Sequence, residues 1–210
     1  MKSSKVLEML IKGYVEELKA ELKDEIYKES LKTVPNAKKR YTAMKKYFTY
    51  VPSVREACTK PATVEYEGWE YTSFCNSYSL VLTTESCGEM VMFDPNKGNY
   101  PDVTRLISFD GEEDKIDISK VIAEAKSQGY KLKRSAVMDN QFIMKYKGNY
   151  FRIGLLDSTF AVIDDGNEAT IYCTPNSNRP ITITNDIGIC VVMPMRFEGE
   201  PDDGTVIIEA

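Results

Sequence analysis

The chain has 210 residues, of which 42% are hydrophobic and 28% charged, and its formal net charge is -5. These values predict an ordinary globular protein with one good core or two small ones. Histidine is absent, which excludes the commonest general base, the usual metal ligand and any Ser-His or Cys-His nucleophile. The acidic total does not exclude nucleic acid as a partner, because a local basic face can bind phosphates on an acidic protein.

The cysteines and the hydropathy pattern exclude further classes of protein. The five cysteines are scattered and never form C-x-x-C, so we expect buried apolar fillers and neither structural zinc nor a disulfide framework. No stretch approaches the roughly 18 to 20 apolar residues of a membrane span. The first residues lack the continuous apolar core of a signal peptide, so we expect a cytoplasmic protein with no membrane partner. The cysteines are Cys58, Cys75, Cys87, Cys173 and Cys190.

Motifs of common enzymes are missing. No G-x-x-x-x-G-K-[ST], G-x-G-x-x-G or G-x-S-x-G occurs in the sequence. Asp164-Asp165 and Asp202-Asp203 each precede a glycine, and aspartate is common in turns for backbone reasons, so a metal site is the less favoured interpretation. We expect no enzymatic activity, no cofactor and no metal.

Residues 5 to 31 are predicted to form a long amphipathic helix. Apolar residues recur at spacings of three and four, and Lys and Glu occupy the opposite face. Such a stripe packs on the chain's own core, which is the commoner use, or on another copy of the chain. The stripe consists of Val6, Leu7, Leu10, Ile11, Tyr14, Val15, Leu18, Leu22 and Ile26.

A second helix is predicted from about Ala37 to Tyr50, after Pro35-Asn36 breaks the first. It is strongly basic, and Lys38, Lys45 and Lys46 can share one face while the aromatic and Met residues occupy the other. Two interpretations carry similar weight: a merely solubilising face, or a surface that follows phosphates without base specificity. Its basic residues are Lys38, Lys39, Arg40, Lys45 and Lys46, interleaved with Tyr41, Met44, Tyr47 and Phe48.

The rest of the chain predicts antiparallel strands with one more helix. That helix begins at Asp117 or Ser119 and ends before Gly129, and Lys120, Lys126, Lys131, Lys133 and Arg134 add a second basic cluster. An acidic loop is expected at 109–114. The sequence therefore predicts an α+β fold in which a helix followed by strands occurs twice. Strands are expected at 63–66, 69–74, around 90–93, and at 141–146, 150–156, 160–164, 169–173 and 181–193.

The apolar run near the C-terminus predicts a strand with one face in a core. Ile187, Ile189, Val191 and Met193 alternate with their neighbours at period 2. Pro194 cannot donate to a ladder, so the strand should end there and leave Met193 and Met195 near the surface. Beyond it, residues 198–204 predict an acidic turn. Thr205 to Ala210 is either one more strand or a segment folded back over Met-Pro-Met.

Two segments carry a resemblance to a known family. Val191-Val192-Met193-Pro194-Met195-Arg196 resembles the C-terminal signature of bacterial sliding clamps, the beta subunit of DNA polymerase III. Asn99-Tyr100-Pro101-Asp102-Val103-Thr104-Arg105-Leu106-Ile107 is similar to the interdomain segment of these clamps, and the order of the two segments agrees. Cys75 to Val81 stands where clamps have Thr-Asp-Gly-His-Arg-Leu, but only Leu80 matches, because Tyr78 and Ser79 replace His and Arg.

The resemblance implies a DNA-clamp-like domain of two helix-plus-antiparallel-sheet modules at 36–197. A long N-terminal amphipathic helix at 1–35 precedes it, and a tail at 198–210 follows. Neither the first segment nor the tail has a counterpart in the family. Bacterial clamps close six such domains into a ring, three per chain, whereas this chain offers one, so a comparable ring needs about six copies.

The function implied is a non-enzymatic processivity factor and homo-oligomer that associates with duplex DNA and binds short peptides of polymerase-type partners. The peptide pocket implied by the resemblance consists of Leu80, Pro101, Arg105, Leu106, Val192, Met193, Pro194, Met195 and Arg196. The basic helices supply the expected DNA contacts, namely Lys38, Lys39, Arg40, Lys45, Lys46, Lys120 and Lys126. An alternative is a clamp-derived interaction module, of phage or other mobile-element origin, that does not encircle DNA. A third is a structural protein in which the motifs are coincidental.

Overall fold

The computed structural model describes residues 2–50, 55–196 and 201–210. The helices are α1 (Lys2–Thr33), α2 (Ala37–Tyr50), α3 (Ile118–Ser127) and α4 (Ile153–Phe160), with short 3-10 turns η1 (Glu56–Thr59), η2 (Pro95–Lys97) and η3 (Thr104–Leu106). Within the described residues, none of the helices combines the length and apolar composition that crossing a membrane requires.

The strands form two sheets. A seven-stranded sheet has the order β1-β2-β3-β9-β8-β7-β4, and a three-stranded sheet has the order β10-β5-β6. All neighbours in the larger sheet are antiparallel, whereas β10 pairs with β5 in parallel. The strands are β1 (Ala62–Tyr66), β2 (Trp69–Cys75), β3 (Ser79–Thr83), β4 (Glu112–Ile116), β5 (Phe142–Tyr146), β6 (Asn149–Arg152), β7 (Ala169–Cys173), β8 (Ile181–Asn185), β9 (Gly188–Val192) and β10 (Val206–Glu209).

The larger sheet is built from two similar units. α2 is followed by β1, β2 and β3, and α4 is followed by β7, β8 and β9. The two units meet at the middle of the sheet, where β3 pairs with β9 from Ser79↔Val192 to Thr83↔Gly188. The α+β class and the repeated helix-then-strands order predicted from the sequence are therefore present.

The second helix of the repeat is not where the sequence analysis placed it. The strand expected at 150–156 is present only as far as Arg152, where β6 ends, because α4 occupies Ile153–Phe160. The strand expected at 160–164 is wrong. All eight residues of α4 are buried, including the polar Asp157, Ser158 and Thr159, so there is no exposed polar face whose periodicity could separate this helix from a buried strand. A Cβ on Gly154 would lie 2.5 Å from the Val137 Cα, so the close approach of this helix requires glycine.

Two further expectations are corrected. The segment expected as an acidic loop at 109–114 contributes most of β4, a charged edge strand that pairs with β7; charge suits an edge because it discourages further pairing. Met90, Met92 and Phe93 form no strand. The predicted cap of α3 is Asp117, whose Oδ1 accepts a hydrogen bond from the Lys120 backbone N–H at 3.0 Å.

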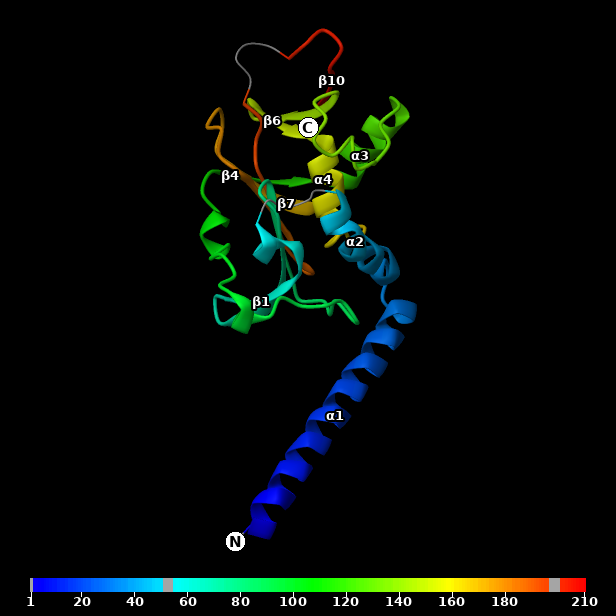
Figure 1. Cartoon of the computed structure of the whole chain (residues 1–210). Coiled ribbons are helices and arrows are strands. Elements are labelled where there is room, and N and C mark those ends of the chain that lie inside the picture. The colour runs from blue at the N-terminus through cyan, green and yellow to red at the C-terminus, as the bar shows by residue number, and fades with distance from the viewer. Residues whose placement is uncertain (1, 51–54, 197–200) are drawn as a thin grey trace.

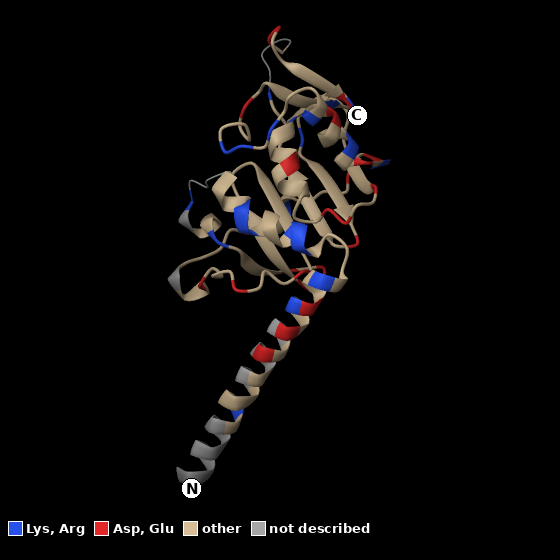
Figure 2. Cartoon of the chain, turned by 90° about the vertical axis from the view of Figure 1, so that its right-hand side faces the viewer, with Lys and Arg blue, Asp and Glu red and all other residues tan. Residues whose placement is uncertain are grey.

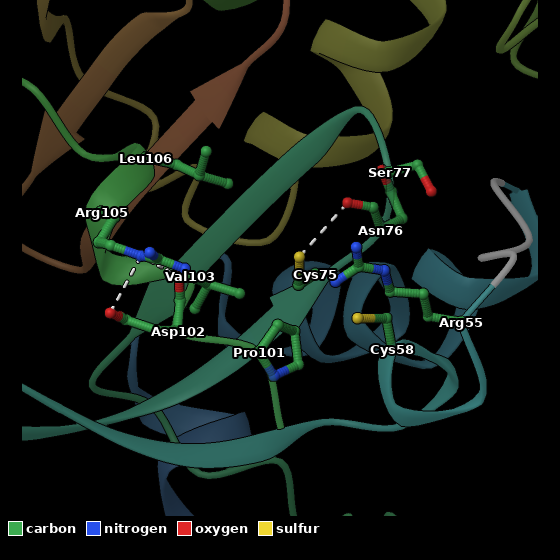
Figure 3. A pocket seen from close by; sticks show the side chains of 10 residues that line it. All are labelled: Arg55, Cys58, Cys75, Asn76, Ser77, Pro101, Asp102, Val103, Arg105 and Leu106. Carbon is green, nitrogen blue, oxygen red and sulfur yellow. Dashed lines mark hydrogen bonds and ion pairs between the residues drawn. The ribbon is translucent and has the colours of Figure 1, made fainter. Parts of the chain in front are cut away.

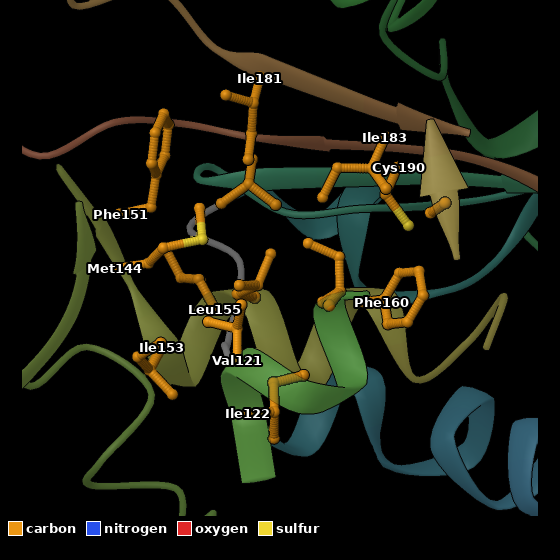
Figure 4. Packing of buried hydrophobic residues seen from close by; sticks show 14 of the residues in the cluster. Val121, Ile122, Met144, Phe151, Ile153, Leu155, Phe160, Ile181, Ile183 and Cys190 are labelled. Carbon is orange, nitrogen blue, oxygen red and sulfur yellow. The ribbon is translucent and has the colours of Figure 1, made fainter. Parts of the chain in front are cut away.

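Each face of the larger sheet has its own core. On one face α2, α3 and α4 cover the sheet (Figure 1), and a large cluster that includes Phe151, Phe160 and Ile183 fills the space beneath them (Figure 4). On the other face a smaller cluster contains Leu80, Val103 and Val191. β9 is consequently buried along its whole length, and the prediction that only one of its faces meets a core is wrong.

The two ends of the chain lie apart. α1 projects from the body (Figure 1), and its Tyr27 ring packs edge to face on Tyr41 of α2 at 5.2 Å. Ile11, Leu18 and Leu22 are exposed, so these residues of the stripe do not pack on the chain's own core, whereas Ile26 lines a cavity against α2. At the other end, Val206–Glu209 is one more strand, paired with β5, and not a cover over Met-Pro-Met. Part of the expected acidic turn, 198–200, lies outside the described residues.

Candidate functional site

A cavity of about 490 Å³ lies on the face of the sheet away from the helices. Arg55 and Cys58 line one side, and Asp102, Val103 and Arg105 line the other (Figure 3). The walls come from η1, from the end of β2 and from the segment before and within η3. The lining residues are Arg55, Cys58, Cys75, Asn76, Ser77, Pro101, Asp102, Val103, Arg105 and Leu106.

The segment 100–107 is held to the sheet by inward-pointing residues. Val103 is buried in the smaller core, and the Tyr100 hydroxyl lies 3.3 Å from Ser73 Oγ of β2. The Thr104 hydroxyl donates to Asp102 Oδ1 at 2.7 Å, and the Ile107 N–H donates to the Thr104 carbonyl at 3.0 Å. The segment thus forms a fixed wall, while Arg105 and Leu106 remain exposed at its rim.

The turn between β2 and β3 forms the opposite rim and is fixed by Asn76. Its side-chain oxygen accepts hydrogen bonds from the N–H groups of Tyr78 and Ser79, both at 2.8 Å. The Tyr47 hydroxyl of α2 donates to the Ser79 carbonyl at 3.1 Å. Tyr78 and Ser79, which stand in place of the His and Arg of the clamp pattern, are therefore part of this hydrogen-bonded turn. Ser77 is left exposed beside the cavity.

The inner wall is apolar with charge at the rim. Burial and the neighbouring Cys58 thiol raise the pKa of Cys75 to about 12, so this group is an uncharged thiol at neutral pH and behaves as an apolar surface. Arg105 Nε forms an ion pair with Asp102 Oδ2 at 3.1 Å. The second guanidinium, that of Arg55, stands on the other side of the cavity (Figure 3), so a cationic side chain lies on each side of the opening.

The cavity includes only part of the predicted pocket. Pro101, Arg105 and Leu106 line it, whereas Leu80 and Val192 are fully buried in the cores on opposite faces. Met193 is half-buried, and its N–H donates to the Tyr78 carbonyl at 3.0 Å, so it lies next to the cavity rim. Pro194 is half-buried and Arg196 is exposed.

Met195 does not lie near the surface, so that expectation is wrong. It is 4% exposed, and its N–H donates to the Tyr150 carbonyl at 2.7 Å, which ties the segment after β9 to β6. The sequence analysis also missed cavity residues. Asp102 and Val103 lay inside a segment already singled out, and Cys75, Asn76 and Ser77 lay inside the segment compared with the Thr-Asp-Gly-His-Arg-Leu pattern, whereas Arg55 and Cys58 carried no sequence signal.

The basic helix presents four of its five predicted DNA contacts. Lys38, Lys39, Lys45 and Lys46 are exposed on α2, which faces the viewer in Figure 2. Lys39 forms an ion pair with the buried Asp164 carboxylate at 2.5 Å. Lys45 Nζ lies 4.4 Å from the centre of the Tyr41 ring.

Arg40 is fully buried, so the expectation that it contacts DNA is wrong. Its guanidinium forms a two-point ion pair with Glu85, with Nε to Oε2 at 2.9 Å, and Nη1 donates to the carbonyls of Pro35 and Asp164. This network joins α2 to the loop after β3 and to the loop after α4. The i, i+3 and i, i+4 spacing of the lysines gave no sign of it, because Arg40 lies on the inward face of the helix.

The predicted contacts on α3 are engaged in ion pairs. Lys120 Nζ lies 3.2 Å from Asp117 Oδ2, and Lys126 Nζ lies 3.5 Å from Asp157 Oδ2. Both lysines remain at least half exposed. Within the described ranges, no three His, Cys, Asp or Glu side chains converge in a way that could hold a metal ion.

Comparison with solved structures finds a likeness of fold. A protein from Eubacterium rectale, provisionally assigned as a DNA polymerase III beta subunit, superposes with a TM-score of 0.51 at 11% identity; the match covers 79% of this chain and 65% of that one. The beta subunit of DNA polymerase III from Thermotoga maritima matches 63% of this chain and 43% of its own, at 12% identity and a TM-score of 0.32. No family model and no curated protein sequence matches. The first likeness establishes a clamp-like fold, and the chain spans about two thirds of that protein's length.

Proposed function

We propose that this chain is a non-enzymatic, sliding-clamp-like protein that binds short peptides of partner proteins in the cavity beneath Pro101–Leu106. The cavity carries the proposal, because it lies on the segment whose sequence resembles the clamp interdomain motif and beside Met193 of the second motif. The clamp-like fold supports it.

The lining indicates the kind of peptide. Pro101, Val103 and Leu106, with Cys58 and the uncharged thiol of Cys75, offer an apolar surface, which suits one or two aliphatic or aromatic side chains. Arg55 and Arg105 at the rim suit a neighbouring acidic side chain or a terminal carboxylate. Met193 and Pro194 extend this surface on one side, since Met193 is bonded to the turn that carries Ser77.

The proposal is tested by the binding of a fluorescently labelled clamp-binding peptide from a polymerase, followed by anisotropy. Leu106→Glu places a carboxylate at the exposed rim and should weaken binding at least about 10-fold, and Met193→Ala should weaken it less. Val91→Glu is the matched control, because Val91 is also an exposed aliphatic residue but does not line the cavity. If Leu106→Glu and Val91→Glu bind the peptide with equal affinity, the cavity is not the peptide site.

Association with duplex DNA is the second part of the proposed function, and the exposed lysines of α2 support it. The helix has no acidic residue, and none of the ion pairs in the described part of the chain involves Lys38, Lys45 or Lys46. Because the whole chain is acidic, such binding would be weak, local and strongly salt-dependent. On the family's plan, the homo-oligomer that closes into a ring contains about six copies of this chain. The cytoplasm is the expected location of the protein.

Retention on circular DNA tests this part. The triple change of Lys38, Lys45 and Lys46 to Glu should abolish retention on a circular duplex, whereas the same change at Lys60, Lys115 and Lys131, also exposed, should reduce it far less. A wild-type protein that is retained equally on linear and circular duplexes does not encircle DNA. That result would favour the alternative, a clamp-derived interaction module, which the single seven-stranded sheet of this chain also supports.

A further inference from the structure

Two of the five cysteines lie next to each other in the wall of the cavity. Cys58 belongs to η1 and Cys75 is the last residue of β2, and both line the cavity. The Cys58 thiol is within hydrogen-bonding reach of the Cys75 thiol. Figure 3 shows both sulfur atoms in the same part of the wall, beside the Arg55 guanidinium. The fold therefore brings together two thiols from different elements.

The other three cysteines lie elsewhere. They belong to the larger core, whereas the pair in the cavity wall belongs to the smaller core on the opposite face of the seven-stranded sheet. All five cysteines are free thiols in this structure. The sheet keeps the three apart from the pair, so they can serve as controls for it. These three are Cys87, Cys173 and Cys190.

Cys58 attaches η1 to the smaller core. Its side chain is 3% exposed, whereas Ala57 is half-buried and Thr59 is exposed. The backbone N–H of Cys58 donates to the Arg55 carbonyl at 3.0 Å, so Arg55 and the thiol belong to one short turn. A change at the two sulfur atoms consequently acts on the wall of the cavity that carries Arg55.

The cavity gives small molecules access to the pair. Both thiols line it although Cys75 is only 5% exposed, and its volume is about 490 Å³. Burial raises the pKa of Cys75, and the Arg55 guanidinium opposes this effect. A cationic neighbour is typical of thiols that react, because it stabilises the thiolate. Since burial is the stronger effect on Cys75, a reaction of this thiol should be slow.

We propose that Cys58 and Cys75 form a reversible disulfide when the protein meets a hydroperoxide, and that this bond weakens peptide binding in the cavity. The bond itself is independent of the proposed function, whereas its effect on peptide binding rests on that function. A bond that forms only under oxidation agrees with the expected cytoplasmic location, because disulfides there are rare and those that form are mostly transient.

The chemistry balances with hydrogen peroxide as the oxidant. The Cys58 sulfur attacks one peroxide oxygen, the O–O bond breaks, and a sulfenic acid and one water are formed. The Cys75 sulfur then attacks the Cys58 sulfur, and the hydroxyl group leaves with the Cys75 proton as a second water. Two thiols are oxidised and one peroxide is reduced to two waters. Because burial keeps Cys75 protonated, the first attack is assigned to Cys58.

The bond should narrow the cavity. Bonded sulfur atoms are about 2.05 Å apart, which is closer than two free thiols approach, so the bond draws η1 towards the end of β2. Arg55 moves with η1, because the two share one turn. The space for an apolar side chain of the peptide shrinks on this side. We therefore expect the oxidised chain to bind the peptide at least about 5-fold more weakly.

Peptide mapping tests the bond without any ligand. The full chain is treated with hydrogen peroxide, its remaining thiols are alkylated, and it is cleaved after glutamate. This cleavage places Cys58, Cys75 and Cys87 in separate fragments, 57–65, 71–85 and 86–89. Mass spectrometry should find 57–65 joined to 71–85, and dithiothreitol should separate them. Cys58→Ser should abolish the cross-link, whereas Cys87→Ser, which removes another buried thiol, should leave it in place.

Peptide affinity tests the regulation. The anisotropy of the labelled clamp-binding peptide is measured with reduced chain, with oxidised chain, and after dithiothreitol. The wild type and Cys87→Ser should lose at least about 5-fold in affinity on oxidation and regain it on reduction. For Cys58→Ser the comparison is made within the variant, and peroxide should leave its affinity unchanged.

Three outcomes would overturn the inference. A map without the joined fragments 57–65 and 71–85 shows that the bond does not form. A cross-link that leaves the affinity unchanged shows that the bond does not regulate the cavity. A loss of affinity that persists in Cys58→Ser comes from oxidation at another residue. If the reduced wild type does not bind the peptide, the proposed function fails together with its regulation, whereas the map still decides whether the bond forms.

Discussion

The two faces of the seven-stranded sheet are covered in different ways. The face under α2, α3 and α4 has the larger core, and the helices fill it with large side chains such as Phe160 and Met44. The other face is covered by irregular chain, 99–107 and η1, whose few inward residues include Val103 and Cys58. Helices cover a sheet continuously, whereas an irregular segment touches it at separate points. The cavity lies on the second face for this reason.

The largest loss of stability should come from a substitution in the core under the helices. Phe160 is 1% exposed, so Phe160→Ala should lower the free energy of unfolding by about 3 to 5 kcal/mol, measured by urea denaturation. Phe109→Ala is the control, because that ring is 42% exposed and packs edge to face on Tyr172 of β7; it should cost no more than about 1 kcal/mol. Similar losses for both would contradict the unequal packing described above.

The second largest loss of stability should come from breaking the ion pair between Arg40 of α2 and Glu85. Arg40→Ala leaves Glu85 without its partner and two carbonyls without their donor. Since the Glu85 side chain is 23% exposed, the loss should be about 2 to 3 kcal/mol, below the value for a fully buried pair. Lys38→Ala, on the exposed face of the same helix, should stay within about 0.5 kcal/mol. A negligible loss of stability for Arg40→Ala would mean that Arg40 is a surface residue after all.

The loop-covered face should tolerate truncation better. Val103→Ala removes two buried carbons next to an existing cavity, so we expect a loss of about 1 to 2 kcal/mol in the same denaturation experiment. Peptide affinity should fall as well, because the cavity loses an apolar wall. A loss as large as that of Phe160→Ala would mean that both faces are packed alike.

The smallest effect should be pH-dependent and confined to the helix face. Burial raises the pKa of Asp157, against the opposing effect of Lys126. Its Oδ2 has no hydrogen-bond partner among the described residues. A raised pKa in the folded state favours the protonated form, so this group stabilises the fold at low pH, and that contribution is lost as the pH rises through the folded pKa.

Asp157→Asn removes this titration. The stability of the variant relative to the wild type should therefore increase between about pH 4 and pH 8, as followed by thermal unfolding. Asp203→Asn, at an exposed position near the C-terminus, provides the control and should show no such trend. A constant difference between Asp157→Asn and the wild type across this range would mean that Asp157 titrates normally.

The amino-acid sequence by itself determined the elements with clear local signals. The helix at 37–50 and its break at Pro35-Asn36, the strands at 63–66 and 69–74, the cap at Asp117, one of the two positions expected, and the strand at 169–173 all agree with the structure. In each case a repeat, a turn residue or a capping side chain acts within a few residues. The segment around Pro101 was likewise singled out before its place beside the cavity was known.

Only the tertiary structure decided which residues meet across the chain. α4 is buried on every side, so nothing local separates it from a strand until the sheet and α3 enclose it. Arg40 and Met195 looked like surface residues because their partners, Glu85 and Tyr150, are far away in sequence. The cavity joins η1, the turn after β2 and the Pro101 segment, three stretches with no shared pattern. Local chemistry fixes elements, whereas burial and partners depend on contacts that only the folded chain makes.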